Sequence, residues 1–334
     1  MVAVERGAPI VARSPCAIFE CAMTVLALIA ALLIEQVRPL DDRGVLARPL
    51  DAALGWLEHT FNTGLHSHGK LAWFIVMGVA GSVTLALYFT LAHVHPVLGL
   101  AFNVGVLYLT MGFRQFSHHF TDIHRALIDG DLARARRLIR AWRGRASDDL
   151  NSVEVARLAI EEAFSASHRH VFGVLFWFAF LPGPVGAVWY RMALLLRAKW
   201  GGGKATGDGR FGEFAVSAFR SIDWLPLRLT ATGFAIVGNF EDALYCWRNQ
   251  ARNWRDPELG IVLASGAGAI GVTLGKSLKE GVTPAGLAMD ERAEIGIGDE
   301  ADAGFLSSTV GLVWRALVLW LLLLVMLAIA QWVS

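Results

Sequence analysis

Long runs of apolar residues dominate the pattern along the chain. Residues 16–34, 71–91, 96–113 and 312–333 reach or approach the length that a helix needs to cross a bilayer, which is about 20 mostly apolar residues. The last run is the clearest, because residues 316–330 carry no charge. The pattern therefore predicts an all-α, polytopic helical membrane protein, with membrane lipid as one of its partners.

A fifth apolar stretch, residues 171–190, is long enough to span but contains the sequence Pro182-Gly183-Pro184. Proline removes a backbone donor, and backbone groups without partners are not tolerated against lipid. This stretch is therefore expected to form a broken or re-entrant helix that is sheltered by protein. Weaker candidates are residues 225–237 and the small-residue segment 259–275, so four to seven spans are possible.

The charge distribution predicts the orientation of the chain. Residues 114–170 contain ten arginines and no lysine, whereas the leader before the first apolar run has two arginines. The positive-inside rule places this segment and the loop 35–70 in the cytoplasm, in a multi-pass protein of the cell inner (cytoplasmic) membrane. The expected units are N-terminal membrane helices in 1–113, a cytoplasmic module in 114–170 and a C-terminal membrane region in 171–334.

The cytoplasmic module has the periodicity of amphipathic helices. Apolar side chains recur at helical spacing between arginines, at Leu132, Ala135, Ile139 and Trp142. Asp131 is a suitable N-cap and Gly144 a suitable stop, and a second helix is expected to open at Asp148 or Asp149. Acidic residues partly balance the arginines, so the sequence predicts no nucleic-acid partner.

Composition supports the membrane assignment and yields no catalytic signature. Hydrophobic residues make up 55% of the chain and charged residues 18%, against about 25% charged residues in soluble domains. No Walker loop, G-x-S-x-G or H-E-x-x-H motif is present. Residues 266–271 match G-x-G-x-x-G, but no βαβ pattern surrounds them. Together with a G-x-x-x-G spacing at Gly271 and Gly275, these glycines predict close helix packing instead.

Histidines and isolated charges are the candidate ligand-binding groups. Imidazoles suit haem iron or a transition metal, and the candidate metal ligands are His118, His119, His168 and His170. Further candidates for ligand contact are Arg114, His124, Arg169, Asp223 and Arg228. The alternatives are solvated loop histidines and, for Asp223 with Arg228, a structural ion pair that caps a helix.

The order of several segments resembles the CobD/CbiB family. The resemblance is carried by residues 130–138 (GDLARARRL), 145–150 (RASDDL), Glu161, the Pro-Gly-Pro element ending at Tyr190-Arg191, residues 223–229 and the small-residue stretch 266–275. It implies a membrane protein of cobalamin biosynthesis, whose activity joins aminopropanol or its phosphate to adenosylcobyric acid in an amide-forming ligation. The related AmpE proteins, linked to β-lactamase regulation, share the D-W-x-P-x-R-L pattern at residues 223–229.

The acidic motif of the family is largely replaced here. Where the synthases carry E-T-x-A-E-N-x-x-D-G, this chain keeps Glu161, the candidate catalytic residue, and has Ala166 and Arg169 at the Asn and Asp positions. A later Asp pair becomes Phe219-Arg220. The family acids would be expected to hold Mg²⁺ or to orient an amine nucleophile. Their replacement argues against retained synthase chemistry and favours an anion or a soft metal centre.

Three hypotheses follow from the sequence. The first is a CobD/CbiB-family scaffold with a cytoplasmic-side pocket for a corrinoid, another tetrapyrrole-like ligand or an anion, using Mg²⁺ if the synthase chemistry persists. The second is an AmpE-like membrane sensor or regulator without catalytic activity. The third is haem or metal binding through the histidines. A homo-oligomer is compatible with each of them.

Overall fold

The computed structural model describes residues 15–37, 52–57, 60, 66–144, 149–201, 210–276 and 293–333. Within these residues the chain is almost entirely helical, as the sequence predicted. A single pair of two-residue strands, β1 (Val272–Thr273) and β2 (Asp299–Glu300), lies parallel beside the last turn of a helix. Most of the loop 35–70 lies outside the described residues.

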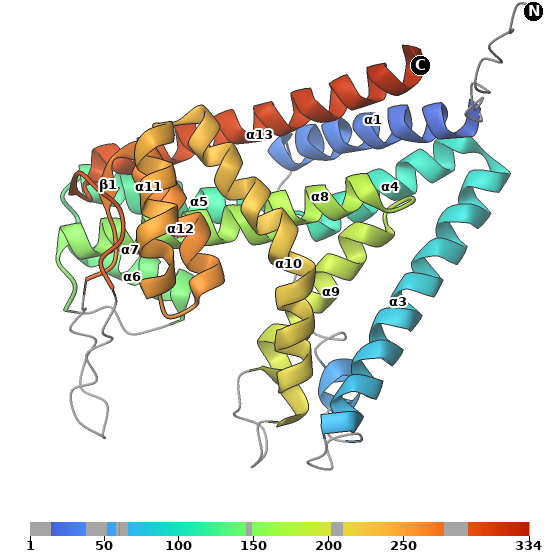
Figure 1. Ribbon diagram of the computed structural model, residues 1–334, viewed down its shortest axis with the longest axis horizontal. Coiled ribbons are helices and arrows are strands. Elements are labelled where there is room, and N and C mark those ends of the chain that lie inside the picture. Colours follow the sequence, from blue (N-terminus) through green and yellow to red (C-terminus); the bar gives the residue numbers. More distant parts are fainter. Residues whose placement is uncertain are drawn as a thin grey trace, which may run out of the picture.

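Four helices with long apolar stretches lie along one side of the molecule (Figure 1). They are α1 (Pro15–Val37), α3 (His66–Val94), α4 (Pro96–Thr110) and α13 (Ala303–Val333). The helices α1 and α13 run side by side, and α4 packs against α1 and α3. Among the described residues, two stretches are long and apolar enough to cross a membrane, His68–Val94 and Ala303–Ala330.

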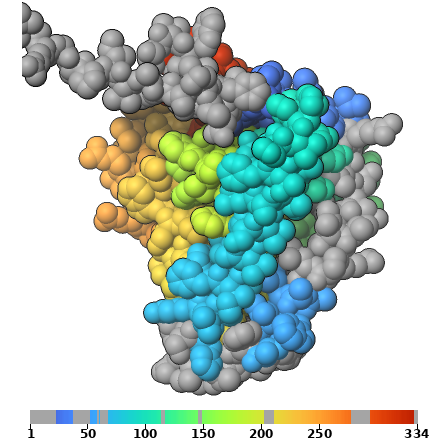
Figure 2. Space-filling view, turned by 90° about the vertical axis from the view of Figure 1, so that its right-hand side faces the viewer, coloured from blue at the N-terminus to red at the C-terminus, as the bar shows by residue number. Residues whose placement is uncertain are grey.

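These two stretches face outward. Only 22% of each apolar window is buried within the protein, whereas the core helix of a soluble protein would be mostly covered. Figure 2 shows α3 running along the face of the molecule turned to the viewer. Exposed side chains of α3 include Phe74, Val79 and Phe89. The expected run 96–113 is interrupted, because α4 has 15 residues and ends at Thr110, which is shorter than the about 20 that a span needs.

The middle of the fold is a long buried helix, and the water-facing side expected for the second helix of the 114–170 module is not present. The helices α7 (Ser152–Ser167), η1 (His168–Phe172) and α8 (Gly173–Phe180) follow one another without a break. Twelve residues of α7 are buried, on all of its sides. Other helices surround α7, so the charged residues in its sequence do not mark a side of the helix that faces water. Its N-cap is Asn151, in a capping box with Glu154, and not Asp148 or Asp149.

The other local signals near α7 are confirmed. The helix α6 (Leu132–Arg143) follows α5 (Phe113–Ile128) and begins where Asp131 accepts a hydrogen bond from the backbone of Arg134, at 2.9 Å. It ends at Gly144, whose φ of 69° is favourable only for glycine. The break expected at Pro182-Gly183-Pro184 is also present, because α8 ends at Phe180 and α9 (Val185–Trp200) packs back against it.

The last part of the core is formed by α10 (Arg210–Val237), α11 (Phe240–Gln250), η2 (Ala251–Asn253) and α12 (Pro257–Ile270). Small residues let α12 approach its neighbours. A Cβ on Gly268 would lie 2.5 Å from the carbonyl oxygen of Asp242, and one on Gly266 would lie 2.9 Å from the ring of Phe164. The proposed Gly271/Gly275 packing face is wrong, since Gly271 ends α12 and Gly275 lies in the following loop.

The contact at Gly268 gives a testable prediction. Because the backbone of Asp242 cannot move as a flexible side chain can, Gly268→Ala should force α11 and α12 apart and lower the free energy of unfolding by about 1–3 kcal/mol. Thermal unfolding of the detergent-purified protein would measure this. A matched control is Gly78→Ala in α3, where an added Cβ meets nothing within 4 Å. Equal unfolding temperatures for both variants would contradict the assigned packing.

Candidate functional site

A cavity of about 440 Å³ lies between α6, α7, η1, α10 and the start of α12. Its charged lining consists of four arginines and three carboxylates, namely Arg143, Arg169, Arg220, Arg255, Glu161, Glu162 and Asp256. We call it the α7–α12 cavity. The segments that form it are far apart in the sequence, so it exists only in the folded chain.

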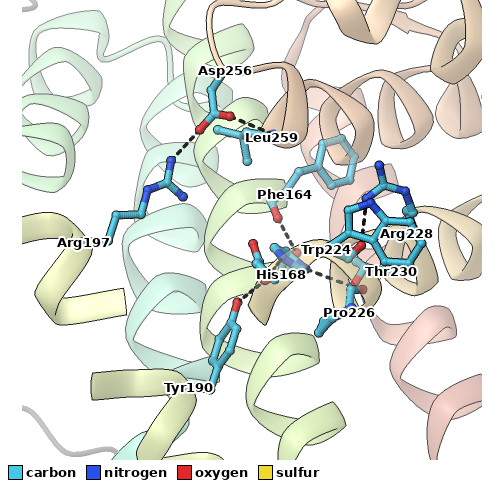
Figure 3. A network of polar contacts seen from close by, with 12 residues as sticks. Phe164, His168, Tyr190, Arg197, Trp224, Pro226, Arg228, Thr230, Asp256 and Leu259 are labelled. Carbon is cyan, nitrogen blue, oxygen red and sulfur yellow. Dashed lines mark hydrogen bonds and ion pairs between the residues drawn. The ribbon is translucent and has the colours of Figure 1, made fainter. Parts of the chain in front are cut away.

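Two of the three carboxylates are already engaged in holding the structure. Glu161 accepts a hydrogen bond at 3.1 Å from the backbone N–H of Gly275, which anchors the loop after β1. Asp256 accepts a hydrogen bond from Arg197 at 2.6 Å and caps the N-terminus of α12 (Figure 3). Four guanidinium groups face three carboxylates, one of which is paired with Arg197 outside the cavity, so positive charge predominates and the arrangement suits an anion.

The same arrangement does not suit Mg²⁺. This ion needs near-octahedral oxygen ligands, and the oxygens available here share the cavity with four positive guanidinium groups. Within the described residues, no three His, Cys, Asp or Glu side chains lie close enough to hold a metal ion. The donor set therefore agrees with the anion expected from the sequence.

Beside this cavity, a buried polar network joins three helices (Figure 3). Asp223 of α10 lies 3.0 Å from His168 Nε2, and it accepts a hydrogen bond at 2.8 Å from the hydroxyl of Tyr190 on α9. His168 Nδ1 lies 3.0 Å from Thr230 Oγ1. All four side chains are at least nine-tenths buried. Each is therefore held by its partners, since water cannot replace them.

The hydrogen bonds hold both ring nitrogens of His168. Nε2 faces the carboxylate of Asp223, which accepts when it is ionised, and Nδ1 faces the hydroxyl of Thr230. Thr230 Oγ1 also lies 2.9 Å from the carbonyl oxygen of Pro226. Burial alone would raise the pKa of Asp223, but attraction to His168 and the hydrogen bonds from His168 and Tyr190 outweigh it and lower this pKa.

Local backbone features make room for the network. His168 begins η1, a π-helical turn, and such turns concentrate at functional sites. Gly173, one turn later, lies against the ring of Tyr190, where a Cβ would be 2.2 Å from the ring carbon Cζ. Any side chain at position 173 would push the hydroxyl of Tyr190 away from Asp223.

The four histidines proposed as metal ligands do not converge. His168 uses both of its ring nitrogens in the network, and His170 contacts Arg191. His119 stacks on Trp142 at a centroid distance of 5.9 Å. Only His119 and His170 of the four line a common cavity, while His118 lines another one beside α1 and α13.

Of the other residues expected to contact a ligand, Glu161 and Arg169 line the α7–α12 cavity. His124 lies partly buried on α5, and the side chain of Arg114 lies outside the described residues. Asp223 and Arg228 do not form a helix-capping pair, because both lie in the middle of α10. Arg228 instead stacks over Trp224, with its guanidinium carbon 4.2 Å from the ring centroid.

Sequence reasoning missed Arg143, Glu162, Arg255 and Asp256 as members of the site. A signal was present for Asp256, because an Asp before a Pro is typical of a helix N-terminus. No sequence signal could place Arg143 or Arg255 in the cavity, since their positions depend on how α6 and η2 pack.

The network leads to a prediction about stability and pH. Asp223→Asn removes the buried carboxylate that both His168 and Tyr190 contact, so the free energy of unfolding at pH 7 should fall by about 3–5 kcal/mol. Because the folded-state pKa of Asp223 is lowered, its contribution is present above the unfolded value of about 3.9 and is lost as the pH falls through the folded value. Denaturant unfolding at pH 7 and at pH 3 would measure both effects.

The variant Tyr190→Phe serves as the control, because it removes one neutral donor and leaves the carboxylate of Asp223 with His168. It should cost about 1 kcal/mol. A wild-type advantage over Asp223→Asn that stays constant down to pH 3 would disprove the role of the ionised carboxylate.

Comparison with known proteins gives a family match over most of the chain. The family described as CobD/Cbib protein matches residues 26–303. "Cobalamin biosynthesis protein CobD" of Stutzerimonas stutzeri is 34% identical over 307 residues, covering 90% of this chain and 96% of its own length. The protein of that name in Chromobacterium violaceum is 38% identical over 183 residues, which cover 54% of this chain and 57% of its own. No solved structure matches. The chain belongs to the CobD/CbiB family.

Proposed function

We propose that this protein acts in cobalamin biosynthesis at the cytoplasmic membrane, and that its α7–α12 cavity binds an anionic group of a pathway intermediate. The observation that carries the proposal is the convergence of Arg169 and Arg220 in one cavity. These are two positions where the resemblance to the synthases places acids. Two arginines at these positions in one cavity favour the binding of an anionic group.

The chemistry of guanidinium groups suggests which ligand this is. Arginine binds carboxylate and phosphate oxygens in a bidentate manner, and such charge-assisted hydrogen bonds are about twice as strong as neutral ones. The reactants that the resemblance implies carry these groups, namely the carboxylate of adenosylcobyric acid and the phosphate of aminopropanol phosphate. A volume of about 440 Å³ is within the range of small-molecule sites.

Binding is favoured here over amide synthesis dependent on Mg²⁺, because four arginines share the cavity with its carboxylates. If synthesis took place, Glu162 would be the carboxylate best able to take a proton from an amine. The other two are engaged, since Glu161 bonds the backbone of Gly275 and Asp256 bonds Arg197.

The multi-pass topology is part of the same proposal. The exposed apolar stretches of α3 and α13 support it, with the runs in α1 and α4 as further membrane-embedded segments.

The proposal predicts the effect of removing one guanidinium. Arg169→Gln should weaken the binding of adenosylcobyric acid or aminopropanol phosphate, whichever binds the wild type, by about ten- to a hundredfold, because a hydrogen bond to a charged group contributes about 1.5–3 kcal/mol. Titration calorimetry on the detergent-purified protein measures this. Arg134→Gln is the matched control, since Arg134 is exposed on α6 and lies outside the cavity. Unaltered affinity in Arg169→Gln would refute the assignment.

A second experiment separates binding from synthesis. The purified protein is incubated with adenosylcobyric acid, aminopropanol phosphate and Mg²⁺, beside an authentic synthase of the family. We expect ligand binding without product. Product formation by this chain would show that the chemistry persists despite the replaced acids.

A further inference from the structure

A second arginine-rich cavity lies on the other side of the first turn of α12. It has a volume of about 380 Å³ and is formed by α10, α11, η2 and α12. Its lining includes Arg228, Trp247, Arg248, Arg252, Glu258 and Ile261. We call it the α10–α11 cavity. None of its arginines lines the α7–α12 cavity, so the function proposed above leaves them unexplained.

The charges of this cavity are unbalanced. Three guanidinium groups face one carboxylate, Glu258, and that carboxylate also lies 3.5 Å from Arg220 outside the cavity. Within the described part of the chain, no ion pair joins Arg248 or Arg252 to an acid. Positive charge therefore accumulates here and favours an anionic ligand.

Arg228 is held in place by an aromatic ring and a backbone carbonyl. Its guanidinium stacks on Trp224 and donates a hydrogen bond at 2.9 Å to the carbonyl of the same residue. In Figure 3, Arg228 and Trp224 lie on the opposite side of His168 from Tyr190 and Arg197. Stacking fixes the plane of the guanidinium and leaves donors free, which is the geometry that phosphate recognition uses.

The surface beside this cavity is apolar and aromatic. Trp224, Leu225, Leu229 and Ile236 form an exposed stripe along α10, and Phe240 and Tyr245 are exposed on α11. The stripe lies next to a candidate membrane span, because α10 packs against α13, with Gly233 near the indole of Trp320 (Figure 1). Aromatic side chains and arginines next to a lipid-facing surface are typical of the headgroup level of a bilayer.

We propose that the α10–α11 cavity binds the phosphate headgroup of an anionic phospholipid, whose acyl chains lie along the α10 stripe towards α13. Free phosphate would satisfy the three arginines but would leave the aromatic and aliphatic stripe exposed to water. A phospholipid satisfies both features with one molecule. The first turn of α12 separates this lipid site from the α7–α12 cavity, so each site can be lost without the other.

The test uses the delipidated full-length protein and three soluble probes: dihexanoyl phosphatidylglycerol, dihexanoyl phosphatidylcholine and inorganic phosphate. Calorimetric titration should show saturable binding of phosphatidylglycerol at least tenfold tighter than binding of phosphatidylcholine or of inorganic phosphate. The double variant Arg248→Gln/Arg252→Gln should bind phosphatidylglycerol no better than phosphatidylcholine. Equal affinity of the two lipids for the wild type would overturn the proposal, and so would inorganic phosphate binding as tightly as phosphatidylglycerol.

Two controls keep the result interpretable. Arg134→Gln/Arg137→Gln removes two exposed charges from α6 and should leave phosphatidylglycerol binding unchanged. If this control variant lost as much affinity for phosphatidylglycerol as Arg248→Gln/Arg252→Gln, the loss would come from the change in net charge, and the proposed site would be refuted. The Arg248→Gln/Arg252→Gln variant should retain the corrinoid or aminopropanol phosphate binding measured for wild type. If Arg169→Gln binds those ligands as the wild type does, while phosphatidylglycerol still binds as expected, the proposed function is refuted and the lipid site is supported.

Discussion

The buried carboxylate of Asp223 is the group on which the arrangement of the core helices depends. Its contact with His168 joins the central helix to α10, and Tyr190 adds α9 through the same carboxylate. Removing a charge from water costs several kcal/mol, and only close, well-oriented partners offset that cost. His168 and Tyr190 provide these partners, and the π-helical turn and Gly173 provide the space. The three helices therefore keep one relative position, because any displacement would leave a buried charge unpaired.

Once α10 is fixed in this way, it supplies charged groups in three directions. Arg220 faces the α7–α12 cavity, Asp223 lies in the core, and Arg228 lines the α10–α11 cavity on the other side. A helix places successive side chains about 100° apart, so three residues within nine positions can serve three environments. The net charge of +1 gives no hint of this separation, since each cluster is balanced only across the whole molecule.

Glu161 has a structural role as well as a place in the cavity lining. Its carboxylate lines the cavity but also holds the backbone of Gly275, so part of its role is to fix the loop that follows β1. The four arginines contribute to the wall of the same cavity, and the network around Asp223 is buried beside it.

The sequence by itself determined the features that depend on neighbouring residues. The caps at Asp131 and Gly144, the break at Pro182-Gly183-Pro184 and the apolar stretches of α3 and α13 follow from local backbone chemistry and solvation, and the family followed from ordered motifs. Tertiary structure alone decided that α7 is buried on all sides, that His168 pairs with Asp223 and not with other histidines, and that Arg169 meets Arg220. The physical reason is that burial and charge pairing arise between helices distant in sequence, and helical periodicity does not encode which helices meet.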